Sequence, residues 1–156
     1  MTPVEMQQLF SDRGYLERTN DDEKDSIRKV LNALKINPAS ELGHFYVAFA
    51  PSLIRSRLSH KQLNDVLYPS VKGTTYPVDD PFDTPLGMAT MFIREVWEVP
   101  DRFICLTSTE GEGAYLYDLS SEEVYYFDLA QQPQLVAGEL EPRWHSFEEF
   151  IKWYLS

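Results

Sequence analysis

The spacing of apolar residues changes once along this chain, and that change constrains the fold more than any other feature. In the first half, apolar residues recur three and four positions apart, as over 27–34, which is typical of one helical face. From about residue 91 they alternate with polar residues, which favours strands. A last helical pattern covers 146–154. The order predicts an α+β fold, in which a mainly antiparallel, twisted sheet packs against N-terminal helices and an aromatic C-terminal helix.

Capping residues predict where five helices begin. The predicted first residues or caps are Thr2, Thr19 or Asn20, Ser40, Ser59 and Ser146. Four runs predict strands, over 91–99, 103–107, 114–118 and 124–129. The last two should form a hairpin with a loop of about five residues. The proline-rich segment 69–87 fits either an edge strand or a functional loop.

A length of 156 residues predicts one domain spanning 1–156. The single cysteine, Cys105, has no partner for an internal disulfide. No basic segment followed by an apolar stretch marks a signal peptide, and no apolar run is long enough for a membrane span. We therefore expect a cytoplasmic protein that has no membrane partner.

The net charge of −11 lies entirely in the second half of the chain. Residues 1–71 hold nine acids and nine bases, whereas residues 72–156 hold sixteen acids and five bases. Between Arg102 and Arg143 there is no lysine or arginine. Such an excess of carboxylates repels phosphates and argues against direct nucleic-acid binding. Two interpretations stay open, a solvated face that aids solubility and a surface for a basic partner.

No group of residues forms a recognised catalytic or metal-binding motif. The three histidines, His44, His60 and His145, lack metal-ligand spacing. Cys105 lies in an apolar run and is interpreted as a core residue. The glycines at 111 and 113 lack the further residues of a phosphate-binding loop. We therefore predict no enzyme activity, no cofactor and no metal.

Several motifs, in this order, resemble the SUKH superfamily, also called the Smi1/Knr4 family. They are the segments 31–38, 45–46, 99–104, 111–118, 124–128 and 144–155. The resemblance covers most of the chain and implies a sheet packed against helices, with no catalytic residues. Many bacterial members are immunity proteins that neutralise polymorphic toxins, often nucleases, and others are interaction modules in regulatory networks.

The leading hypothesis is an immunity protein whose partner is a basic toxin domain. A regulatory scaffold of the same fold is the alternative, and a small ligand-binding domain or hydrolase is the third hypothesis. The third requires a concave pocket with convergent polar groups and a shifted pKa. Candidate partner-binding residues lie in the proline-rich segment, the glycine turn and the hairpin, because loops on a rigid sheet often carry binding residues. They are Asp79, Asp80, Asp83, Glu110, Glu112, Tyr115 and Tyr117.

Overall fold

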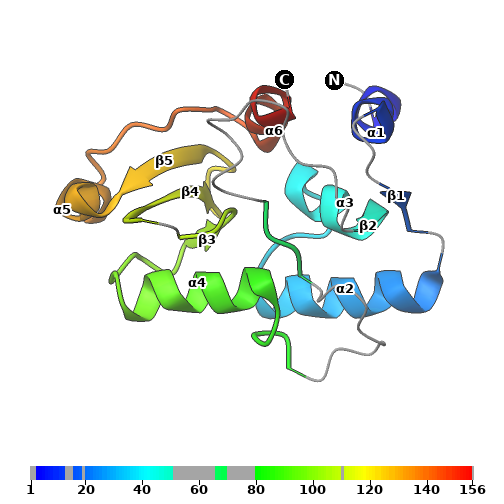
Figure 1. Ribbon diagram of the computed structural model, residues 1–156, viewed down its shortest axis with the longest axis horizontal. Coiled ribbons are helices and arrows are strands. Elements are labelled where there is room, and N and C mark those ends of the chain that lie inside the picture. Colours follow the sequence, from blue (N-terminus) through cyan, green and yellow to red (C-terminus); the bar gives the residue numbers. More distant parts are fainter. Residues whose placement is uncertain are drawn as a thin grey trace.

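A three-stranded antiparallel sheet packs against helices on both of its faces (Figure 1). The computed structural model describes residues 3–12, 16–18, 20–50, 66–69, 80–109 and 111–155. Helices precede the sheet and a helix follows it, so the predicted α+β class is confirmed. In the described part of the chain, no helix is long and apolar enough to cross a membrane.

Three helices form the N-terminal part. They are α1 (Pro3–Asp12), α2 (Asp21–Ala33) and α3 (Glu41–Ala48). The predicted caps of the second and third helices are confirmed, because Asn20 Oδ1 accepts from Asp22 N at 2.9 Å and Ser40 Oγ accepts from Gly43 N at 3.1 Å. The short strands β1 (Leu16–Glu17) and β2 (Phe49–Ala50) pair antiparallel beside these helices. The predicted helix starts at Thr2 and Ser59 lie outside the described residues.

The main sheet has the order β3-β4-β5, with β3 (Phe103–Cys105), β4 (Gly113–Asp118) and β5 (Val124–Asp128). The predicted hairpin is confirmed, since Leu116 pairs with Tyr125 across β4 and β5. Neighbouring segments bond to the outer strands. Leu67 N donates to Leu106 O at 2.8 Å, Cys105 N donates to Thr90 Oγ1 at 3.1 Å, and Val124 N donates to Trp144 O at 2.9 Å.

Side chains alternate between the two faces of the sheet, as the pleat of a strand requires. Ile104, Tyr117 and Val124 join the core formed with α1, α2, α3 and α6 (Phe147–Leu155). On the other face, Phe103 and Leu116 join a second core beneath α4 (Pro85–Glu95). Because both faces are covered, every residue from 103 to 107 is buried.

The predicted strand over 91–99 is wrong, because residues 85–95 form α4. Thr84 Oγ1 accepts from Gly87 N at 3.0 Å and Pro85 is the first helical residue, a common pair of helix-start signals. This helix carries apolar residues on more than one face, so it lacks the polar face that reveals a helical period. The two-residue spacing of Met91 and Ile93 was therefore interpreted as the alternation of a strand.

The sequence left the conformation of segment 69–87 undecided, and the structure shows that its last residues, from Pro85, begin α4. Residues 70–79 lie outside the described part. After β5, the chain continues through η2 (Leu129–Gln131) and α5 (Gln132–Val136), which the sequence interpretation missed. The predicted start of α6 is confirmed, because Ser146 Oγ accepts from Glu149 N at 3.2 Å. The rings of Trp144, Phe150 and Trp153 form an aromatic cluster where this helix meets the sheet.

Candidate functional site

The predicted partner-binding acids lie in two separate places. Asp80 and Asp83 are exposed in the turn that precedes α4, where Asp80 Oδ1 accepts from Phe82 N at 2.9 Å. Glu112 is exposed at the start of β4, and its carbonyl accepts from Leu129 N at 2.7 Å beside η2. In Figure 1 the start of α4 lies toward α2, whereas α5, which follows η2, lies at the opposite end of the molecule. Asp79 and Glu110 lie outside the described residues.

The two candidate tyrosines lie inside the fold. Tyr117 is only 2% exposed, and its hydroxyl donates to Glu122 Oε1 at 3.2 Å. Tyr115 is half-buried, with its ring centroid 5.5 Å from that of Trp144 and 5.4 Å from that of Phe150. Alternation along β4 placed both side chains on the face that packs against helices. We therefore remove Tyr117 from the candidate surface and assign Tyr115 to the aromatic cluster.

Asp118, the last residue of β4, is a buried carboxylate that accepts several hydrogen bonds. It is 4% exposed and accepts from Ser120 N at 2.8 Å and Ser120 Oγ at 2.6 Å. Arg102 Nε lies 3.3 Å from its second oxygen. Burial by itself raises the pKa of Asp118. The hydrogen bonds from Ser120, a further hydrogen bond from Ser121 N and the positive charge of Arg102 together outweigh burial, so the pKa is lowered. This carboxylate stabilises the β4–β5 turn and holds Arg102.

The other described bases of the second half are also engaged. Arg94 Nη2 donates to Asp101 O at 2.6 Å and to Phe103 O at 3.1 Å. The guanidinium carbon of Arg143 lies 4.9 Å from the centre of the Tyr126 ring. Lys152 Nζ pairs with Glu148 at 3.1 Å. These cations therefore stabilise local structure, and among the described residues none of them forms an ion pair with an exposed acid.

In the second half of the chain, which contains the main sheet and is called the sheet half below, residues 80–109 and 111–141 include several exposed carboxylates that form no ion pair. They are Asp80, Asp83, Glu95, Glu98, Asp101, Glu112, Glu122, Glu139 and Glu141. Several follow or end α4, which the sequence interpretation did not identify as a helix. Most of these carboxylates lie next to α4 or α5 in the chain, and Glu122 lies at the β4–β5 turn. Such an excess of negative charge attracts cations.

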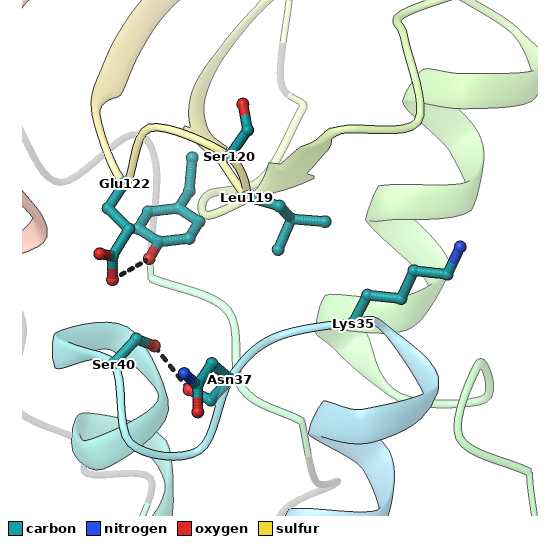
Figure 2. Close-up of a pocket in the computed structure, with 7 residues that line it drawn as sticks. Lys35, Asn37, Ser40, Leu119, Ser120 and Glu122 are labelled. Atoms are coloured by element: carbon teal, nitrogen blue, oxygen red, sulfur yellow. Dashed lines mark hydrogen bonds between the residues drawn. The ribbon is translucent and has the colours of Figure 1, made fainter.

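A small polar pocket opens where the α2–α3 loop meets the β4–β5 turn (Figure 2). Its volume is about 160 Å³, and it is lined by Lys35, Asn37, Ser40, Tyr117, Leu119, Ser120 and Glu122. Ser40 Oγ donates to Asn37 O at 2.6 Å, and Figure 2 shows both residues facing Glu122 across the pocket. Lys35 extends away from these side chains.

The pocket has some of the features that a ligand-binding domain requires, namely polar lining groups and a shifted pKa. Burial raises the pKa of Tyr117, and the adjacent Glu122 carboxylate raises it further. However, pockets for drug-sized ligands have volumes of about 300–1,000 Å³. The hydroxyls of Ser40, Tyr117 and Ser120 already bond within the protein. The pocket therefore has room for a small polar molecule at most.

Cys105 has a structural role. Cys105 is fully buried, its Sγ donates to Thr107 O at 2.9 Å, and burial raises its pKa to about 12, so the predicted core position is confirmed. His44 and His145 are exposed, and His60 lies outside the described residues. Over the described ranges, no three or more His, Cys, Asp or Glu side chains are grouped so that they could hold a metal ion.

Comparison with known proteins finds no matching family model, no matching curated protein and no matching solved structure. Membership of the Smi1/Knr4 family therefore stays a prediction from the motifs of the chain.

Proposed function

We propose that this protein is a non-catalytic immunity protein that binds and neutralises a toxin domain with a basic surface. One observation carries the proposal. The exposed acids of the sheet half have no ion pairs among the described residues, while the described bases of that half are held by other groups. Charge of this kind attracts a cationic partner and repels anionic ones.

A toxin that cleaves nucleic acid has a positively charged cleft, because it must receive phosphates. Carboxylates displayed by an inhibitor can occupy such a cleft and accelerate the encounter of the two proteins. Resemblance to the Smi1/Knr4 family favours the same role, since many bacterial members are immunity proteins. A regulatory scaffold would use the same surface for a partner that is not toxic.

The experiment begins with affinity capture from the native cell, identification of the bound protein by mass spectrometry and purification of that protein. Co-expression then tests immunity, because a toxin partner should arrest growth alone and not beside this protein. A captured partner that is harmless when expressed alone would contradict immunity and favour the scaffold. The purified partner also supports kinetic measurements at low and high salt.

A matched pair of variants tests the acidic surface with this partner. Asp80→Asn with Asp83→Asn removes two carboxylates ahead of α4, and Asp21→Asn with Asp22→Asn removes two at the start of α2. We expect the first pair to slow association by about three- to tenfold at low salt and to flatten its salt dependence. The second pair should have a much smaller effect. Equal effects would contradict a localised acidic surface.

A further inference from the structure

Exposed apolar side chains form a row on the outward face of α4 and at Val96, the residue that follows it. Met88, Phe92 and Val96 are 59%, 39% and 61% exposed, and they follow one another at intervals of four residues. Side chains at this interval are neighbours on a helix, so the three form a stripe along it. We call them the α4 stripe. Its length is about 12 Å, from the rise of about 1.5 Å per residue.

The folding of α4 does not require this stripe. The opposite face of the helix already buries Thr90 and Ile93 against the sheet, and Leu86 is buried in the core formed with the N-terminal helices. Surface helices normally present polar side chains on the outer face. Scattered exposed apolar residues are ordinary, but apolar residues that adjoin one another on one face mark interaction sites.

Phe92 is held in place before any partner arrives. Its ring lies 5.4 Å from the Trp97 ring at an interplanar angle of 67°, an edge-to-face arrangement. Trp97 is itself 8% exposed and belongs to the core beneath α4. A rigid aromatic side chain at the centre of an apolar stripe is typical of a residue that anchors an interface.

Carboxylates border the stripe at both ends. Asp83 is exposed just before α4, Glu95 is exposed in its last turn, and Glu98 is exposed beyond Val96. Arg94 lies in the same helix, donates to the backbone oxygens of Asp101 and Phe103, and offsets one of the negative charges near the end of α4. The complementary surface is therefore apolar in its middle and cationic at its ends.

We infer that the α4 stripe docks an amphipathic helix of the partner, with apolar residues on one face and lysine or arginine beside them. This inference rests on the proposed binding of a basic protein and specifies where and how it binds. Rows of side chains four apart pack into the grooves of a second helix. A second copy of this chain fits poorly, because it would bring the same carboxylates against each other.

The first test uses a synthetic helical peptide of about 15 residues, with leucines along one face and lysines on the others. A peptide of the same composition in scrambled order is the control, because it has the same charge without the apolar face. We expect the helical peptide to bind at least about tenfold more tightly. Changes in amide NMR shifts should concentrate in residues 84–98. Equal affinities, or shift changes that avoid α4, would overturn the inference.

The second test separates apolar docking from charge. Met88→Glu and Lys29→Gln each make the net charge more negative by one, the first on the α4 stripe and the second on the exposed face of α2. If the stripe docks the peptide, Met88→Glu weakens binding by about tenfold or more despite its extra charge, because a carboxylate must be buried. Lys29→Gln should leave affinity unchanged or slightly stronger. Unchanged or tighter binding by Met88→Glu would overturn the inference.

The two proposals fail in different ways. If both peptides bind equally at low salt and both dissociate at high salt, a basic partner remains supported and helix docking is wrong. If neither peptide binds at low salt, attraction of a basic partner is contradicted as well. Sedimentation of the protein alone tests whether a second copy of the chain occupies the α4 stripe. A dimer that Met88→Glu abolishes would assign the stripe to that second copy and overturn the inference.

Discussion

The helices α2 and α4 lie in the lower half of the molecule in Figure 1, and both bury one face in a core. Their outer faces differ. α2 exposes Asp25, Arg28 and Lys29, with Arg28 and Asp25 paired at 2.9 Å, whereas α4 exposes the α4 stripe with carboxylates at its ends. The charged residues on the outer face of α2 are those expected of a helix that faces solvent. The apolar residues on the outer face of α4 are not.

The largest expected effect concerns the buried faces, where the two helices should behave alike. Ile27 in α2 and Ile93 in α4 are both 0% exposed. Ile27→Ala and Ile93→Ala should each lower the free energy of unfolding by about 2–5 kcal/mol, because each leaves a cavity in a packed core. Urea denaturation followed by circular dichroism measures both. A loss below about 1 kcal/mol at Ile93 would mean that α4 is held much more loosely than α2.

The next effect is specific to the start of α4. A Cβ added at Gly87 would lie 2.7 Å from Pro81 O and 2.8 Å from Phe82 Cα, both backbone atoms. Gly87→Ala should therefore destabilise the protein by about 1–3 kcal/mol, although alanine normally favours a helix. Thermal denaturation compares it with the wild-type protein. A stabilised variant would show that the turn before α4 does not pack against the helix.

The comparison also applies to two ion pairs, the Asp118–Arg102 pair, whose carboxylate is buried, and the exposed pair Asp25–Arg28. Asp118→Asn should lower the free energy of unfolding by about 1–2 kcal/mol at pH 7, because the carboxylate is buried and holds Arg102. Asp25→Asn removes the exposed partner of Arg28, so its effect should be at most about 0.5 kcal/mol. Equal losses at the two sites would contradict the difference in burial.

The effect of Asp118→Asn should depend on pH. Since the folded pKa of Asp118 is lowered, its ionised form stabilises the protein fully above about pH 4, where aspartate titrates in an unfolded chain. This contribution is lost as the pH falls through the folded pKa. The difference between wild-type and Asp118→Asn protein should therefore shrink below about pH 4. Urea denaturation at a series of pH values measures it, and a difference that grows on acidification would contradict the lowered pKa.

The smallest effect concerns the outer faces. Met88→Gln and Lys29→Gln should each change the free energy of unfolding by no more than about 0.5 kcal/mol, because both side chains are exposed. A large loss from Met88→Gln would mean that Met88 supports the fold, and the α4 stripe would then need no partner to explain it. Differential scanning calorimetry at one pH compares the two variants.

The same contrast explains how much of the fold the sequence predicted. The helix starts at Asn20, Ser40 and Ser146 follow from local capping chemistry, which operates within three residues and is visible in sequence. The hairpin follows from alternation and its loop length. By contrast, α4 was missed because its outer face is apolar, so no polar stripe marked a helical period. Thr84 and Pro85 were the available signal for its start.

The candidate site was predicted less completely, because it depends on contacts between distant segments. The excess of acid was correctly placed in the second half, and Asp80, Asp83 and Glu112 are exposed there. Tyr117 was expected at an interface because tyrosines are common in interfaces. Its burial depends on the helices that cover its face of the sheet, and alternation within one strand does not report whether the opposite layer exists.

The outer side of β3 restricts the ways in which another protein can be recognised. Thr90, Arg94 and Leu67 already bond to the backbone of residues 103–106, so a foreign strand has no open row of amides and carbonyls to pair with there. Recognition on this side must rest on side chains. If the proposed partner binds on this side, substitutions at exposed positions can alter partner choice while the backbone stays the same, which allows specificity to diverge without a change of fold.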